Sequence, residues 1–122
     1  MAAMKSRRPY LLPGLYEWIV DSGCTCHIML DVNYSGVDIP EGLDKDGRLV
    51  LDISPAAIRN LDFDAYFMSF LAQFDRVTHE IAVPYGAVMA IMGVESGEHI
   101  SFEDDADPSL PPGSQGHLQI IK

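Results

Sequence analysis

Hydrophobic residues near the start of the chain recur at the spacing of a helix. Between Arg8 and Ser22 they form two neighbouring apolar rows. The first row holds Leu11, Leu15, Trp18 and Ile19, and the second holds Leu12, Tyr16 and Val20. Only Glu17 and Asp21 interrupt the pattern, and a helix that is apolar over so much of its surface is buried on more than one side. The second buried side belongs either to a deep core of this chain or to an interface with another copy.

Pro13 and Gly14 lie inside this helical pattern. Proline removes a backbone hydrogen bond and glycine raises the entropic cost of the helix. We therefore expect a kink or a late start, with Pro13 in the first turn. Gly23 is the expected end of the helix.

The pattern then changes to the period of two that is typical of half-buried strands. Residues 24–33 alternate cleanly, with Cys24, Cys26, Ile28, Leu30 and Val32 on one face. Further strands are expected at residues 48–53, 66–74, 77–83, 88–94 and 99–102, with a short extended piece at 37–39. Turn signals at 44–47 and 75–76 predict hairpins. Ser54 and Pro55 predict a cap and first turn of a short helix over residues 56–59.

These elements predict an α+β fold that is mainly β. A leading helix is followed by a small antiparallel sandwich or partly open β-barrel. Residues 1–102 form the folded domain. The strand at 66–74 is apolar on both faces, which marks it as a candidate for a second contact besides the core.

Composition and charge narrow the class of partner. The chain has 122 residues, of which 48% are hydrophobic and 21% are charged, and its net charge is −10. A chain with no basic face is a poor match to nucleic acid or to an anionic membrane surface. No apolar run is long enough for a membrane span, and the basic N-terminus makes a poor signal peptide. A cytoplasmic location is the default expectation.

Residues that could carry chemistry are scattered. Cys24 and Cys26 lie two apart without a second pair, so they are expected to pack in the core and not to bind metal. The four histidines have no metal-ligand spacing. We find no motif for catalysis or for a cofactor, so a non-catalytic binding module is the expected class.

The last twenty residues differ from the rest of the chain. Residues 103–116 are acidic and then rich in Pro, Gly and Ser, a composition that predicts a flexible linker. Residues 117–122, His-Leu-Gln-Ile-Ile-Lys, are apolar again. This hexapeptide is either a final strand that folds back on the body or a short motif that binds a partner.

The chain resembles the stringent starvation protein B (SspB) family. The resemblance rests on Arg7-Arg8-Pro9-Tyr10-Leu11-Leu12, Tyr16-Glu17-Trp18, Asp46-Gly47-Arg48-Leu49-Val50-Leu51, Asn60-Leu61, Phe70-Leu71-Ala72-Gln73-Phe74, Val83-Pro84 and Leu118-Gln119-Ile120-Ile121-Lys122. These segments cover the body in the right order. The resemblance implies an Sm-like, partly open barrel without catalytic residues, and an adaptor that delivers ssrA-tagged polypeptides to the ClpXP protease.

The same resemblance assigns roles to individual residues. The ssrA tag is expected in a groove at Phe70, Ala72, Gln73, Phe74, Val77 and Ile100. Leu118, Ile120, Ile121 and Lys122 are expected to dock on the N-terminal zinc-binding domain of ClpX. A homodimer is expected to form through Leu11, Leu15, Tyr16, Trp18 and Ile19. The alternative to the adaptor is a structural or assembly module with a small β-barrel, in which the hexapeptide is the last strand.

Overall fold

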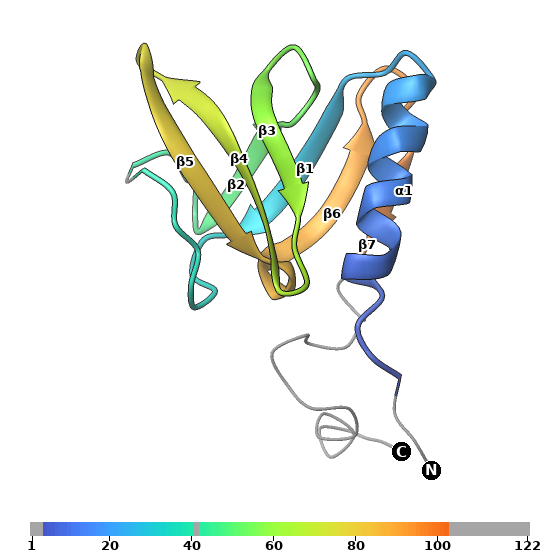
Figure 1. The fold of residues 1–122 in the computed structure, drawn as a ribbon, viewed down its shortest axis with the longest axis horizontal. Coiled ribbons are helices and arrows are strands. Elements are labelled where there is room, and N and C mark those ends of the chain that lie inside the picture. Colours follow the sequence, from blue (N-terminus) through green and yellow to red (C-terminus); the bar gives the residue numbers. More distant parts are fainter. Residues whose placement is uncertain (1–3, 41, 103–122) are drawn as a thin grey trace.

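The computed structural model describes residues 4–40 and 42–102. Within them, one helix precedes seven strands and a short 3₁₀ turn (Figure 1). The elements are α1 (Arg8–Asp21), β1 (Cys26–Asp31), β2 (Arg48–Asp52), β3 (Ile58–Phe63), β4 (Phe67–Phe74), β5 (Val77–Pro84), η1 (Tyr85–Ala87), β6 (Val88–Gly93) and β7 (His99–Ser101). The expected α+β class, mainly β with a leading helix, is confirmed.

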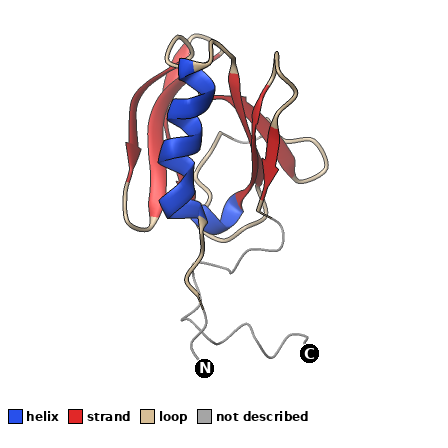
Figure 2. Cartoon of the chain, turned by 90° about the vertical axis from the view of Figure 1, so that its right-hand side faces the viewer, coloured by secondary structure: helices blue, strands red, loops and turns tan. Residues whose placement is uncertain are grey.

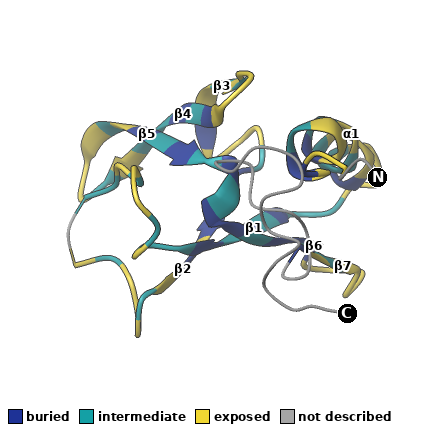
Figure 3. Ribbon diagram, turned by 90° about the horizontal axis from the view of Figure 1, so that it is seen from below, coloured by how far each residue is buried: buried dark blue, intermediate teal, exposed yellow. Residues whose placement is uncertain are grey.

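The strands form two antiparallel sheets that do not close on each other. One sheet has the order β2-β1-β6-β7, and the other has the order β3-β4-β5. Figure 3 shows the sheets as two layers, and α1 packs mainly against β6 and β1 of the four-stranded sheet. The predicted extended piece at 37–39 contacts the edge of β5, where Asp38 and Ala82 exchange backbone hydrogen bonds of 3.0 and 3.3 Å. The result is the partly open barrel that the sequence predicts.

The helix begins earlier than expected. It runs from Arg8 to Asp21 with Pro13 inside it, so of the expected kink or late start, the late start with Pro13 in the first turn is wrong. Pro9 occupies the first turn instead, where a missing N–H costs little because that group has no helical partner. Figure 2 shows α1 standing alongside the strands.

A buried arginine fixes this early start. Arg8 is 6% exposed. Its Nε donates to the carbonyl of Val88 at 2.9 Å, and a terminal guanidinium nitrogen donates to the carbonyl of Phe102 at 2.8 Å. The guanidinium also lies 5.8 Å from the centre of the Phe102 ring. Arg8 thus joins the first turn of the helix to β6 and to the last described residue of the body.

The predicted short helix at 56–59 is wrong. Ser54 to Ala57 form a turn, and β3 follows from Ile58 to Phe63. Ile58 pairs with Ala72 of β4, so the ladder with β4 holds this segment in a strand conformation. Local cap chemistry pointed to a helix start, but non-local strand pairing decides the conformation.

Two tight hairpins match the turn signals. Asp75 and Arg76 both have positive φ angles, 53° and 68°, in the two-residue connection between β4 and β5. At the other hairpin, Asp46 and Gly47 have φ angles of 56° and 80° between Lys45 and Arg48. Positive φ at both central residues is the requirement of a type I′ turn.

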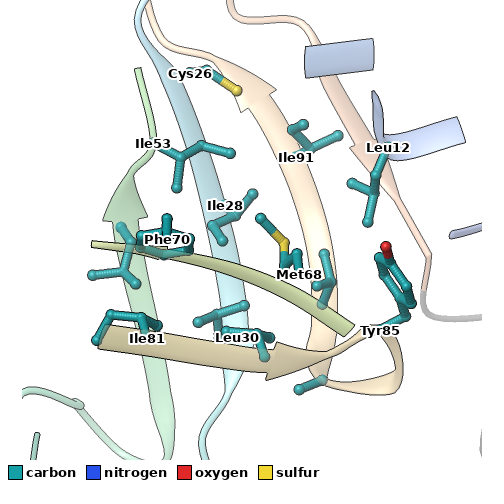
Figure 4. Packing of buried hydrophobic residues seen from close by; sticks show 14 of the residues in the cluster. Leu12, Cys26, Ile28, Leu30, Ile53, Met68, Phe70, Ile81, Tyr85 and Ile91 are labelled. Atoms are coloured by element: carbon teal, nitrogen blue, oxygen red, sulfur yellow. The ribbon is translucent and has the colours of Figure 1, made fainter. Parts of the chain in front are cut away.

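The hydrophobic core lies between the two sheets and the helix (Figure 4). On β1 the alternation is as predicted, with Cys26, Ile28 and Leu30 all fully buried. Burial raises the pKa of the Cys26 thiol to about 12, with a further contribution from Asp52. The thiol is therefore protonated and unreactive near neutral pH, as expected for a core residue.

Two further observations bear on the expected organisation. In the described part of the chain, no helix is long and apolar enough to cross a membrane. The linker at 103–116 and the hexapeptide at 117–122, which the sequence analysis separates from the body, lie outside the described residues.

Candidate functional site: a groove on the three-stranded sheet

A groove of about 410 Å³ lies on the three-stranded sheet. Residues of the turn before β3, of β3 itself, of the end of β4 and of the start of β5 line it. They are Pro55, Ala56, Ala57, Ile58, Arg59, Leu71, Ala72, Gln73 and Thr78. Ala72 lies at its centre in the ladder, opposite Ile58 on one side and His79 on the other. The small side chains of Ala56, Ala57 and Ala72 leave the space open.

Hydrogen bonds hold the turn that forms one wall. The Ser54 carbonyl accepts the backbone N–H groups of Ala57 at 2.8 Å and Ile58 at 3.2 Å. The Ser54 hydroxyl accepts the N–H of Cys26 at 2.9 Å, and the Ser54 N–H donates to the Asp52 carboxylate at 2.9 Å. Ser54 therefore anchors the groove wall to strands of the other sheet.

A β-bulge shapes the strand beside the groove. The pairing of β3 with β4 shifts register between Arg59 and Asp62, and Asn60 has a φ of 57°. Asparagine tolerates this left-handed conformation better than most residues. The extra residue bends β3 and increases its local twist, as bulges do beside binding sites.

The charge of the groove differs from that of the body. The described lining has one cation, Arg59, and no carboxylate, whereas residues 1–102 carry fourteen acids against seven basic residues. The groove therefore repels an acidic ligand less than the overall charge of the body would suggest.

The structure brings together some of the predicted tag-binding residues. Ala72 and Gln73 line the groove. Phe74 and Val77 are directly opposite each other at the hairpin end of the same sheet, where the Phe74 ring lies 5.8 Å from that of His79. Val77 is 55% exposed and available to a ligand.

The other two predicted tag-binding residues lie elsewhere. Phe70 is 2% exposed and belongs to the core beneath the sheet. Ile100 is on β7, at the edge of the four-stranded sheet, where it pairs with Ile91. A role in peptide binding for either residue stays a prediction.

Sequence reasoning missed the wall formed by residues 55–59 and Thr78. The short helix expected at 56–59 would have turned these residues away from β4. The apolar positions Ile58, Leu61 and Phe63 hold the missed signal, because a bulge shifts the alternation by one residue after Ile58.

A second candidate surface is the outer face of α1. Tyr10, Leu11 and Trp18 are 70%, 40% and 48% exposed. Gly14 lies one turn from Tyr10 and from Trp18, and an added Cβ there would meet nothing within 4 Å. An exposed apolar stripe with a glycine at its centre allows another helix to approach closely.

The other residues predicted at a dimer interface lie deeper. Leu15 is half-buried, and Tyr16 packs edge-on against Phe63 with ring centres 6.2 Å apart. Ile19 is 3% exposed and belongs to the core of this chain. The apolar residues of the helix are thus divided between the core and the surface. The structure adds Tyr10 to the exposed residues.

The remaining predictions about sites concern metals and docking. Within residues 4–40 and 42–102, no group of three or more His, Cys, Asp or Glu side chains is placed to hold a metal ion. The predicted docking residues Leu118, Ile120, Ile121 and Lys122 lie outside the described residues.

Comparison with known proteins gives two findings. A family model described as "Stringent starvation protein B" matches residues 6–117. The "Stringent starvation protein B homolog" of Haemophilus influenzae is 39% identical over 99 residues, which cover 81% of this chain and 66% of that relative. The chain therefore spans just under two thirds of the relative's length.

Proposed function

The chain belongs to the stringent starvation protein B family, and from this premise we propose that it is a proteolytic adaptor. Its groove binds the ssrA tag of incomplete polypeptides, its helices pair two copies, and its C-terminal hexapeptide docks on the N-terminal zinc-binding domain of ClpX. The groove on the three-stranded sheet is the observation that carries this proposal.

The chemistry of the groove supports a peptide ligand. Its lining mixes apolar side chains with Gln73 and Thr78, which can both donate and accept hydrogen bonds. A volume of about 410 Å³ suits a few residues of extended chain and not a whole folded partner. Arg59 and the absence of carboxylates among the lining residues favour an acidic peptide such as the ssrA tag.

The dimer and the docking peptide supply the other half of the activity. The linker of fourteen residues extends to at most ~50 Å and spans roughly 20 Å on average if flexible. Tag and docking peptide then act at high effective concentration, and two copies strengthen a weak contact through avidity.

The test is binding of a fluorescently labelled ssrA peptide, measured by anisotropy, to the natural protein and to Ala72→Gln. The larger side chain fills the groove, so we expect affinity to fall at least about tenfold, or about 1.4 kcal/mol. The matched control is Ala65→Gln, because Ala65 is exposed in the β3–β4 turn and lies outside the groove.

Each outcome is informative. If the natural protein does not bind the peptide, the adaptor proposal fails. If Ala72→Gln binds as well as Ala65→Gln, the peptide occupies another surface. Deletion of residues 117–122 is expected to leave the fold and peptide binding intact while abolishing stimulation of ClpXP. A truncated chain that no longer folds would instead identify the hexapeptide as a structural strand.

A further inference from the structure

Among the described residues, no strand pairs with the outer edge of the four-stranded sheet at β2. β2 is the first strand of the order β2-β1-β6-β7. At its start, the N–H and carbonyl of Arg48 bond to Lys45, at 3.1 and 2.8 Å. Alternate residues of an antiparallel strand direct these groups to the same side. Val50 and Asp52 therefore direct theirs to the same open edge, where no described residue bonds to them.

A hollow of about 600 Å³ borders this edge. Its lining is Leu43, Lys45, Asp46, Arg48, Leu49 and Val50. Val50 is an exposed apolar residue, with 46% of its surface accessible. Two of the three charged residues here are cations, in a body whose net charge is negative. Open backbone groups beside an apolar wall suit an extended apolar peptide.

The chain carries such a peptide in its own sequence. Residues 117–122 hold the apolar side chains of Leu118, Ile120 and Ile121. Phe102 is the last described residue of the body. Its N–H donates to the Met89 carbonyl at 2.9 Å, and its carbonyl accepts a hydrogen bond from the Arg8 guanidinium. This point lies beside β7, at the opposite edge of the same sheet.

The linker is long enough for the crossing. Four strands spaced about 4.8 Å apart separate the two edges by about 14 Å. The linker of residues 103–116 reaches at most ~50 Å. A tether of this length gives an effective concentration in the millimolar range, so even a weak contact is substantially occupied.

We propose that the C-terminal hexapeptide docks on the open edge of β2 in its own body. The contact is a strand addition. It satisfies the outward backbone groups of Val50 and Asp52 and covers the apolar wall of the hollow. Its consequence rests on the proposed function: the hexapeptide is withheld until the ClpX domain competes for it.

The test is amide hydrogen exchange, followed by NMR, in the full chain and in residues 1–116. We expect the amides of Val50 and Asp52 to exchange about two- to tenfold more slowly in the full chain. The reason is that a millimolar effective concentration occupies at least half of a site whose dissociation constant is millimolar. The amide of Leu71, in the other sheet, serves as the internal reference and keeps one rate in both proteins.

Two variants make the result specific. Ile120→Asp with Ile121→Asp leaves the body untouched and is expected to restore the fast exchange of residues 1–116. Val50→Pro blocks the edge without removing a bond to β1, because the Val50 N–H is directed outward. It is expected to abolish the slowing at Asp52.

Two results would overturn the proposal. Equal exchange in both proteins would show that the edge is free of the hexapeptide. Slow exchange that persists in residues 1–116 and depends on protein concentration would assign the edge to a second copy. Neither experiment contains ClpX or an ssrA peptide, so this proposal and the adaptor function fail independently.

Discussion

At the scale of single residues, the groove depends on side chains that are small or oppositely charged to the ligand. Ala72 matters because it leaves space between Ile58 and His79. Arg59 matters because it is the one cation among the described lining residues. The resemblance to a family singled out Ala72, but only the pairing of β3 with β4 brings Arg59, opposite Leu71, into the same lining.

Arg59→Gln tests the electrostatic part of recognition. We expect this change to weaken binding of the acidic ssrA peptide a few-fold at low salt and to flatten the dependence of its affinity on salt, because an exposed charge acts through a screened field. Anisotropy titrations at several salt concentrations measure both effects. Lys5→Gln, which removes an exposed cation outside the groove, is the control. If both variants behave alike, the body's overall charge governs binding.

Glu95 provides a residue-scale prediction about pH. Its carboxylate accepts the Thr25 N–H at 2.6 Å and the Thr25 hydroxyl, and these bonds lower the pKa of Glu95 below its ordinary 4.5. A lowered folded-state pKa adds stability that is present above pH 4.5 and lost as the pH falls through the lowered value.

Glu95→Gln should therefore lower the free energy of unfolding near pH 7, and the difference from the natural protein should vanish toward pH 2. Urea unfolding at the two pH values measures it. Glu98→Gln, in the same turn, serves as the control for loss of charge. A difference that is the same at both pH values would rule out the ionised bond as its origin.

At the scale of elements, α1 contributes its first turn, a buried face and an exposed face. Leu12 and Ile19 pack in the core, while Tyr10, Leu11 and Trp18 remain at the surface. The first turn is held by Arg8, which donates to the carbonyl of Val88 in β6 and to that of Phe102, which follows β7. The helix is thus joined to the point where the chain leaves the body.

Arg8→Met is predicted to be strongly destabilising. The apolar side chain leaves the carbonyls of Val88 and Phe102 without their donors, at about 1–3 kcal/mol for each buried group. We expect the melting temperature to fall by roughly 10 °C or more. Arg8→Lys should recover little, because an ammonium cannot reproduce the planar fork of donors.

Lys5→Met is the matched control, since Lys5 is exposed and near in sequence. Differential scanning calorimetry compares the three variants. If Arg8→Met and Lys5→Met have the same melting temperature, the hydrogen bonds of Arg8 contribute nothing to stability.

At the scale of the whole molecule, the exposed stripe on α1 and the negative charge of the chain act against each other. The apolar stripe favours pairing of two copies about a twofold axis. A net charge of −10 on each copy opposes it. The proposed dimer should therefore become more stable as salt screens the repulsion.

Trp18→Glu is predicted to convert the dimer to a monomer, because it places a charge in the centre of the stripe. Light scattering after size-exclusion chromatography measures the mass. Tyr66→Glu is the control, since Tyr66 is 80% exposed in the β3–β4 turn, away from the helix. A dimer that survives Trp18→Glu must use another face.

Local patterns by themselves determined most of the elements. Period-two alternation in residues 24–33 and positive-φ signals at 46–47 and 75–76 act within a few residues, so they can be read without the fold. The open barrel with a leading helix followed from their number and order. The groove could not be predicted in this way, because its wall at 55–59 forms only through pairing with β4. The bulge at Asn60 interrupts the alternation that would have indicated this strand.

Tertiary structure alone decided which apolar residues are free to bind. Trp18 and Ile19 are neighbours on one helix, and Phe70 and Ala72 lie on one strand face, yet one of each pair is buried and the other is accessible. A core residue and a binding residue can be equally hydrophobic in the sequence. They differ in whether other segments of the chain pack against them, and those segments are far away in the sequence.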